Sequence, residues 1–182
     1  MKDFATWTLE TIRKDPSHMS WMEEKRFEWV PLAAHAINDL LNDHTFLLIT
    51  DREREWFSRY ILSHLNNLQN NRPLLPLISL GTIFPFMDKI KTKEEMDSLD
   101  DMLSLSFPNG YTFFYIGKSN NIRAQIAKRK DNSFLWLLDE HIQNAFYLPE
   151  DELLDIKLIQ LIRLFDKSID AVLFAEVELG IL

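Results

Sequence analysis

The strongest candidate for chemistry in this sequence is the short loop Gly117-Lys118-Ser119, between a predicted buried strand and a predicted helix. A glycine, a lysine and a hydroxyl residue at this place are typical of loops that bind nucleotide phosphates. Such a loop also needs a glycine five residues before Gly117, and Thr112 stands there. The sequence therefore argues against a nucleotide site and leaves open a single anion bound by free amides at the helix start.

A second candidate is Thr50-Asp51-Arg52, at the end of another predicted strand, where α/β sheets bind ligands. Asp51 has no nucleophile or metal partner nearby in sequence, so capping of the next helix is favoured over a role as a base. The histidines at positions 18, 35, 44, 64 and 141 lack metal-ligand spacing. The absence of cysteine excludes thiolate chemistry and disulfides. We therefore predict no catalytic residue, no metal and no cofactor.

Composition and charge narrow the functional classes. The 182 residues are 46% apolar and 26% charged, which predicts one globular domain over residues 1–182. A net charge of −8 disfavours general binding to a phosphate backbone. The basic run Lys128-Arg129-Lys130, with Arg123 nearby, is predicted to be a solvated face, and a contact with an acidic partner is the alternative. We expect no direct sequence-specific binding of nucleic acid.

No apolar stretch approaches the roughly 20 residues of a membrane span. The start of the chain, Met1-Lys2-Asp3-Phe4, carries an early acid and has no apolar signal core. These features predict a protein of the cytoplasm that does not associate with membranes.

The elements that must position the two loops alternate between strands and helices, which indicates an α/β fold with a parallel sheet. Strands are predicted at 45–50, 74–80, 111–116, 133–138 and 145–148. Helices are predicted at 3–14, from Ser20 to about Leu40, from Asp51 to about Leu65, from Thr92 to Leu103, at 120–130 and at 150–178. Residues 82–91 stay unassigned.

Local signals refine these boundaries. Pro76 predicts an edge position or a late start for the second strand, and Pro31 predicts a kink or a new helix. Capping boxes are predicted from the spacing of a hydroxyl residue and a glutamate: Ser20 with Glu23, Thr50 with Glu53, and Thr92 with Glu95.

Apolar residues of the last helix form a stripe too wide for one sheet face. Deep burial and a subunit interface explain this equally well. Trp56 and Tyr60 lie beside the predicted core face of their helix, and Trp21 lies at a helix start. Aromatic side chains at such edges are common interface anchors, although core packing is at least as good an interpretation for each.

Several segments together resemble the HobA family of bacterial replication regulators over nearly the whole chain. They are Ser20-Trp21, Glu55-Trp-Phe-Ser-Arg-Tyr-Ile-Leu-Ser63, Arg72-Pro-Leu-Leu75, Ser133-Phe-Leu-Trp-Leu-Leu-Asp-Glu140 and the helix segment Leu154–Lys167. The resemblance implies a three-layer, sugar-isomerase-like (SIS) α/β fold with about five parallel strands in a flavodoxin-like doubly wound order. It also implies a homotetramer that binds the N-terminal domain of the initiator DnaA, promotes its assembly at the origin as DiaA does, and is not an enzyme.

For the partner-binding surface we predict the strand-end rim and the adjoining helix, with Asp51, Arg52, Trp56, Arg59 and Lys118. The alternative is a sugar-phosphate-binding enzyme or sensor of the same fold, with its ligand near Lys118 and the following serine. Against it, the loop after the first strand carries Asp51 and Glu53, whose carboxylates would repel a phosphate.

Overall fold

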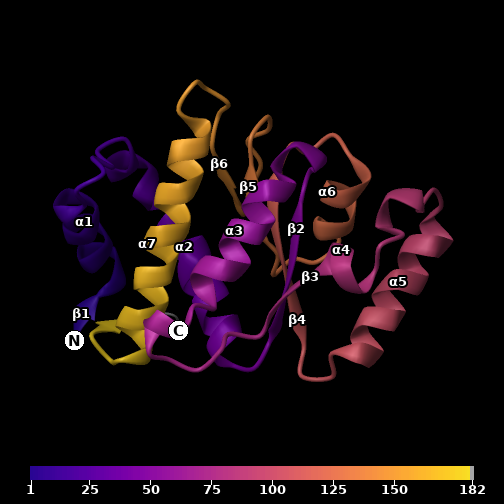
Figure 1. The fold of residues 1–182 in the computed structure, drawn as a ribbon, viewed down its shortest axis with the longest axis horizontal. Helices are drawn as coiled ribbons and strands as arrows, with labels where there is room; N and C mark the ends of the chain where they lie inside the picture. Colours follow the sequence, from indigo (N-terminus) through magenta and orange to yellow (C-terminus); the bar gives the residue numbers. More distant parts are fainter. Residues whose placement is uncertain (181–182) are drawn as a thin grey trace.

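The computed structural model describes residues 1–180, and a parallel sheet of five strands forms the centre of this part of the chain (Figure 1). The strands lie in the order β3-β2-β4-β5-β6. Their bounds are β2 Thr45–Thr50, β3 Leu77–Ser79, β4 Tyr111–Gly117, β5 Phe134–Leu137 and β6 Ala145–Tyr147. The predicted α/β class and the parallel sheet are confirmed, and all five predicted strands are present.

Helices follow the strands as the alternation predicted. Their bounds are α1 Phe4–Lys14, α2 Met22–Leu41, α3 Glu55–Leu65, α4 Leu80–Ile83, α5 Lys93–Ser106, α6 Ile122–Ala127 and α7 Leu154–Leu173. Short 3-10 turns lie at η1 Arg52–Arg54, η2 Leu68–Asn70 and η3 Met87–Lys89. The unassigned segment 82–91 therefore contains the end of α4 and η3.

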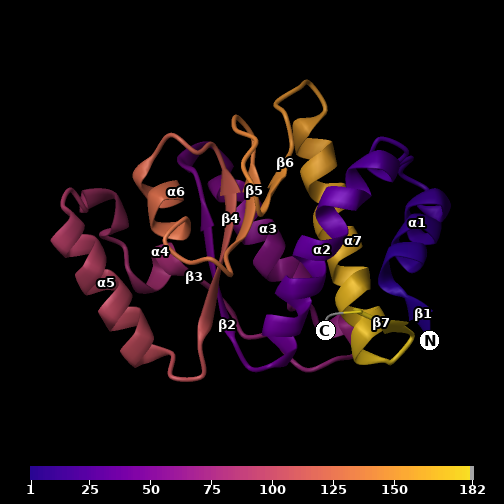
Figure 2. The same ribbon diagram turned by 180° about the vertical axis from the view of Figure 1, so that it is seen from behind.

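Helices cover both faces of the sheet and make three layers (Figures 1 and 2). Successive side chains of a strand point to opposite faces. In β2, Phe46 and Leu48 pack into the core with α2, α3 and α7, whereas Leu47 and Ile49 pack with α5 and α6. Because both faces are covered, the central strands are apolar on both sides.

The wide apolar stripe of α7 is explained mainly by burial within the chain. Leu158, Leu161 and Ile162 are completely buried, since α7 contacts α1 and α2 as well as the core of the sheet. Leu153 and Ile156 are each 55% exposed near the start of the helix. The structure thus accounts for most of the stripe and leaves a small apolar surface at one end.

Two of the three predicted capping boxes are wrong. Thr92 and Glu95 form theirs at the start of α5. At α2 the helix begins at Met22 without a side-chain cap, and Glu23 instead accepts hydrogen bonds from Arg13 on α1. The predicted box of Thr50 and Glu53 is replaced by a cap from Asp51 on η1.

The structure tests the predictions made for Pro31 and Pro76. The helix α2 runs through Pro31 without interruption, so the prediction of a new helix there is wrong. The strand β3 begins after Pro76 and lies at the edge of the sheet, as predicted. An edge strand tolerates proline because the missing N–H is not needed on its outer side.

The ends of the described chain form a pair of two-residue parallel strands that the sequence analysis missed, β1 Lys2–Asp3 and β7 Val177–Glu178. Strands this short have no detectable periodicity, and β7 falls inside the helix predicted to run to residue 178. That helix ends at Leu173 instead. Among residues 1–180, no helix has both the length and the hydropathy that crossing a membrane requires.

Candidate functional site

The candidate site lies where the loops after β2 and β4 leave the same edge of the sheet. These neighbouring strands mark the point at which the strand order reverses, and open α/β sheets bind ligands outside the carboxyl ends of strands at such a point. Residues of both loops, including Asp51, Arg52 and Lys118, line a cleft of about 390 Å³, the loop cleft. The structure therefore brings three of the five predicted site residues together.

Asp51 lies beneath this surface, with 7% of the residue exposed. Its carboxylate caps η1 by accepting a hydrogen bond from the Arg54 backbone N–H at 3.1 Å. It also accepts from the Lys118 backbone N–H at 2.9 Å. The predicted capping role is confirmed, and the same carboxylate ties the two loops together.

Two backbone amides of the second loop already have partners within the chain. Lys118 N–H donates to Asp51, and Ser119 N–H donates to the carboxylate of Asp139 at 2.7 Å. These amides are the donors that a phosphate would need in this loop. The amides of Lys118 and Ser119 are therefore not free to hold an anion, because two carboxylates of the chain take that place. An anion at the start of α6, which begins at Ile122, stays a prediction.

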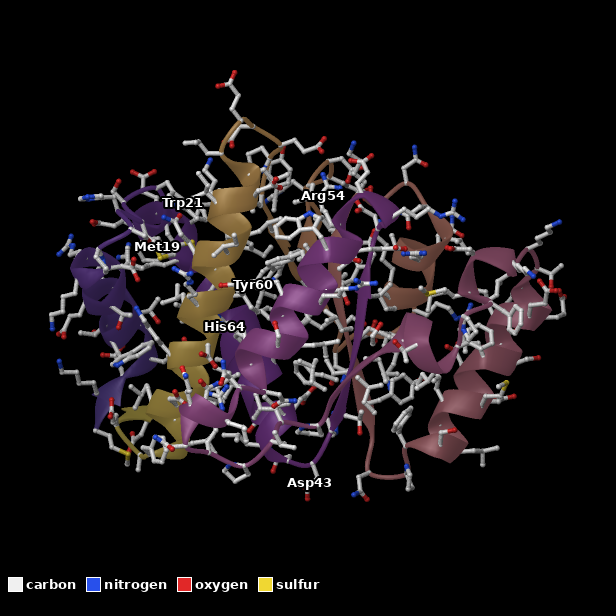
Figure 3. All side chains as sticks on the ribbon, viewed as in Figure 1. Met19, Trp21, Asp43, Arg54, Tyr60 and His64 are labelled. Atoms are coloured by element: carbon white, nitrogen blue, oxygen red, sulfur yellow. The ribbon has the colours of Figure 1, made fainter. Side chains whose placement is uncertain are left out.

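Beside the loop cleft, the buried Arg54 joins segments that are far apart in the sequence through ion pairs. The sequence analysis did not single out this residue. Its side chain is only 6% exposed and forms ion pairs with Asp51 at 2.5 Å and Glu150 at 2.6 Å. Glu150 also lies 3.3 Å from the Lys118 ammonium, and this pairing, with Glu53 nearby, raises the pKa of Lys118. In Figure 3, Arg54 lies at the end of α3 nearest the strand ends.

A second buried arginine, Arg123, lines the loop cleft. Its guanidinium donates two hydrogen bonds to Asp88, at 2.8 and 2.7 Å, and further ones to the Thr50 carbonyl and to Glu55, both at 3.0 Å. The hydrogen bonds from Arg123 lower the pKa of Asp88. Arg52, whose side chain is 77% exposed, contacts the same Asp88 at 3.3 Å. Arg123 therefore belongs to this site and not to a basic patch.

The remaining predicted residues lie on α3. Trp56 is 41% exposed and its ring packs beside Phe57 at a centroid distance of 5.3 Å. Arg59 is exposed and lines a separate cavity of about 370 Å³ between α3 and α4, the α3 cavity. Trp56 and Arg59 are adjacent on the helix surface because they are three residues apart. The rim thus consists of the loop cleft and the solvent-facing side of α3.

The aromatic side chains of Trp21 and Tyr60 form contacts within the chain (Figure 3). The Trp21 indole N–H donates to the Gln160 side chain of α7 at 2.8 Å. Tyr60 stacks on His64 and accepts a hydrogen bond from Arg163 of α7 at 3.2 Å. Contact with α7 therefore accounts for the half-buried Trp21 and Tyr60, whereas Trp56 remains open to solvent.

The basic run 128–130 does not form a solvated cationic face. Lys128 pairs with Glu140 at 2.8 Å, and Arg129 pairs with Asp97 and Asp100 at 2.5 and 2.6 Å. The Lys130 ammonium lies 3.7 Å from the centre of the Tyr111 ring, and burial lowers its pKa. All three cations are thus engaged within the chain.

Comparisons with known proteins agree along nearly the whole length. The model of a family described as "HobA: DNA replication regulator" matches residues 1–179. The DNA replication regulator protein HobA of Helicobacter pylori is 32% identical over 186 residues, which cover 98% of this chain and all of the relative.

Solved structures of HobA also resemble this chain over nearly its whole length. A crystal structure of H. pylori HobA has a TM-score of 0.75, and one of a HobA–DnaA (domain I–II) complex from that organism has 0.74. Both are 32% identical and cover 98% of this chain and 99% of theirs. Phosphoheptose isomerase GmhA from Neisseria gonorrhoeae, 13% identical, has a TM-score of 0.54 over 92% of this chain and 91% of its own. This last likeness confirms the SIS-like fold.

Proposed function

This chain belongs to the HobA family of DNA replication regulators, and we propose that it binds the N-terminal domain of its host's initiator DnaA as a single-domain, non-catalytic protein of the cytoplasm. The observation that carries the proposal is the match to H. pylori HobA over 98% of the chain, together with the crystal structure of a HobA–DnaA complex. A scaffold that holds several initiator molecules would promote their assembly at the origin.

For the contact surface we propose the exposed part of the rim, made by Arg52, Trp56, Arg59 and Lys118. Tryptophan and arginine are the residue types that most often dominate binding energies at protein interfaces. Trp56 is 41% exposed, and the side chain of Arg52 is 77% exposed, with one ion pair, to Asp88 at 3.3 Å, among the described residues. The buried Asp51 supports this surface, because its carboxylate accepts backbone hydrogen bonds from both loops.

A non-catalytic role is supported by the way in which the charges of the site are paired. Asp51, Glu150 and Asp88 each face a buried or half-buried cation of the chain at 3.3 Å or less. A general base needs a carboxylate free to take a proton from a substrate. The engaged basic run 128–130 likewise supports the absence of direct sequence-specific binding to DNA.

The contact surface is tested by measuring the affinity of the protein for the DnaA N-terminal domain of the same organism. We expect Trp56→Ala to weaken binding about 30-fold, as is common for a central aromatic anchor. Arg52→Glu, which reverses a rim charge, is expected to weaken it about tenfold. The control is Leu105→Ala, since Leu105 is 85% exposed at the end of α5 that leads to the opposite edge of the sheet. Wild-type affinity in folded Trp56→Ala and Arg52→Glu variants would place the surface elsewhere.

We also propose that the protein is a homotetramer, so that the bound initiator domains meet at an effective concentration set by geometry. Leu153 and Ile156 at the start of α7 supply exposed apolar surface for contacts between copies. Light scattering after size exclusion is expected to give four times the chain mass at micromolar concentration. A monomer under these conditions would contradict the scaffold while leaving one-to-one binding of the initiator possible.

A further inference from the structure

Two cations at the rim of the loop cleft, Arg52 and Lys118, each contact a carboxylate from outside the two loops that carry them. The Arg52 guanidinium lies 3.3 Å from the carboxylate of Asp88, which belongs to η3. The Lys118 ammonium lies 3.3 Å from the carboxylate of Glu150, in the segment between β6 and α7. Two further segments of the chain therefore contribute side chains to the rim.

Each of these carboxylates is anchored by a buried arginine. Arg123, whose side chain is 10% exposed, donates hydrogen bonds to both oxygens of Asp88, at 2.8 and 2.7 Å. Arg54 donates to one oxygen of Glu150 at 2.6 Å, and the other oxygen of Glu150 faces Lys118. Hydrogen bonds between charged groups are stronger than those between neutral groups. The buried arginines therefore fix the positions of Asp88 and Glu150.

A carboxylate that is held in this way differs from the carboxylate of an ordinary surface ion pair. An exposed pair has to order two flexible side chains, and this entropy cost offsets most of the Coulomb attraction. At the rim, the buried arginine has already ordered the carboxylate, so only Arg52 or Lys118 remains to be ordered. The contact with the carboxylate then limits the directions in which the cation projects into solvent.

We propose that Asp88 and Glu150 are positioning residues, which orient Arg52 and Lys118 for contact with the initiator domain. The proposal rests on the proposed function, because both cations belong to the contact surface proposed there. Immobilising a long side chain at an interface costs free energy on binding, and a side chain that is ordered in advance avoids part of this cost. Asp88 and Glu150 thus raise the affinity through the two cations.

The positioning of Arg52 is tested in the isolated protein by NMR relaxation of the arginine side-chain Nε–H groups, which reports motion on the picosecond to nanosecond timescale. Arg59 is the internal reference, because it is exposed and none of the ion pairs among residues 1–180 includes it. We expect Arg52 to be more ordered than Arg59 in the wild-type protein and to become as mobile as Arg59 in Asp88→Asn. Equal mobility of the two arginines in the wild-type protein would overturn the proposal, and so would an unchanged order of Arg52 in the variant.

The effect on binding is tested with the DnaA N-terminal domain of the same organism. We expect Asp88→Asn and Glu150→Gln each to weaken binding about threefold to fivefold, as the ordering cost of one side chain predicts. A positioning residue acts only through its cation, so Asp88→Asn is expected to change the affinity less than twofold in an Arg52→Ala background. The same is expected for Glu150→Gln in a Lys118→Ala background.

Asp97→Asn is the matched control for the loss of one negative charge. Asp97 is paired with Arg129 at 2.5 Å on α5 and does not line the loop cleft, so the variant is expected to bind within twofold of wild type. Wild-type affinity in the folded Asp88→Asn and Glu150→Gln variants would overturn the proposal. Undiminished effects of these two changes in the backgrounds that lack the cation would also overturn it, since they would show a role that does not pass through Arg52 or Lys118.

Two further measurements separate this proposal from other causes of weak binding. Circular dichroism establishes that Asp88→Asn is folded, which is expected because Arg123 keeps its hydrogen bonds to the Thr50 carbonyl and to Glu55. Absence of binding by the wild-type protein would contradict the proposed function. The NMR measurement would still test the positioning of Arg52 in that case, because it needs no partner.

Discussion

Replacing Arg54 by alanine is expected to lower the free energy of unfolding by about 3–5 kcal/mol. The change leaves the carboxylate of Asp51, a residue that is 7% exposed, without its cation and with the backbone N–H groups of Arg54 and Lys118 as its remaining donors. An uncompensated buried charge is far more costly than the loss of a surface ion pair. Urea denaturation followed by circular dichroism measures the effect, and Arg52→Ala is the matched control. Arg52 is 77% exposed, so a loss below about 0.5 kcal/mol is expected there.

A double-mutant cycle with Asp51→Ala gives a sharper test of the same pair. If the cost of Arg54→Ala arises from the unpaired carboxylate, the double variant should lose less stability than the two single variants together, by at least about 1 kcal/mol. Additive losses would show that Arg54 stabilises the fold mainly through Glu150 or through packing of its own side chain.

Gly117→Ala is expected to destabilise the protein by about 2–4 kcal/mol, because a methyl group there has no space. A Cβ at Gly117 would lie 2.7 Å from both the Asp51 carboxylate and the Tyr115 hydroxyl oxygen, and the φ angle of this residue is +155°. The Tyr115 hydroxyl also donates to the Lys118 carbonyl at 2.5 Å, so the neighbours cannot move without breaking the loop. Thermal and urea denaturation of the variant measure the loss.

Gly180→Ala is the control for backbone strain alone. Its φ angle is +64°, and within residues 1–180 no atom beyond its chain neighbours lies within 4 Å of the position of its Cβ. A cost of about 1–2 kcal/mol is expected for a residue other than glycine in this conformation. If the two alanine variants were destabilised equally, contact with Asp51 and Tyr115 would not be the reason for glycine at 117.

The sequence was most informative for features that depend on residues close together along the chain. The strands, their parallel arrangement and the edge position of β3 follow from apolar runs, their alternation with helices and Pro76. The family follows from the segments that resemble HobA proteins. The cap from Asp51 was favoured in advance for the same reason, since its acceptor and donor are three residues apart.

Prediction was weakest for charged side chains. Arg54 was missed because it lies among four alternating charges, Asp51-Arg52-Glu53-Arg54, which have the composition of a solvated surface. Only folding brings Glu150, 96 residues away, next to it. The same applies to Arg123, whose partner Asp88 is 35 residues distant. An ion pair between distant residues has no periodicity or spacing that could reveal it.

The sequence alone therefore determined the fold class, the family and which two loops meet at the strand ends, because these depend on local pattern and on the geometry of parallel strands. The tertiary structure decided what those loops can bind. It showed that carboxylates of the chain occupy the amides of the Gly117-Lys118-Ser119 loop, and that Arg59 faces a separate cavity. The physical reason is that charge neutralisation depends on distances of a few ångströms between side chains from different elements, which only the packed fold defines.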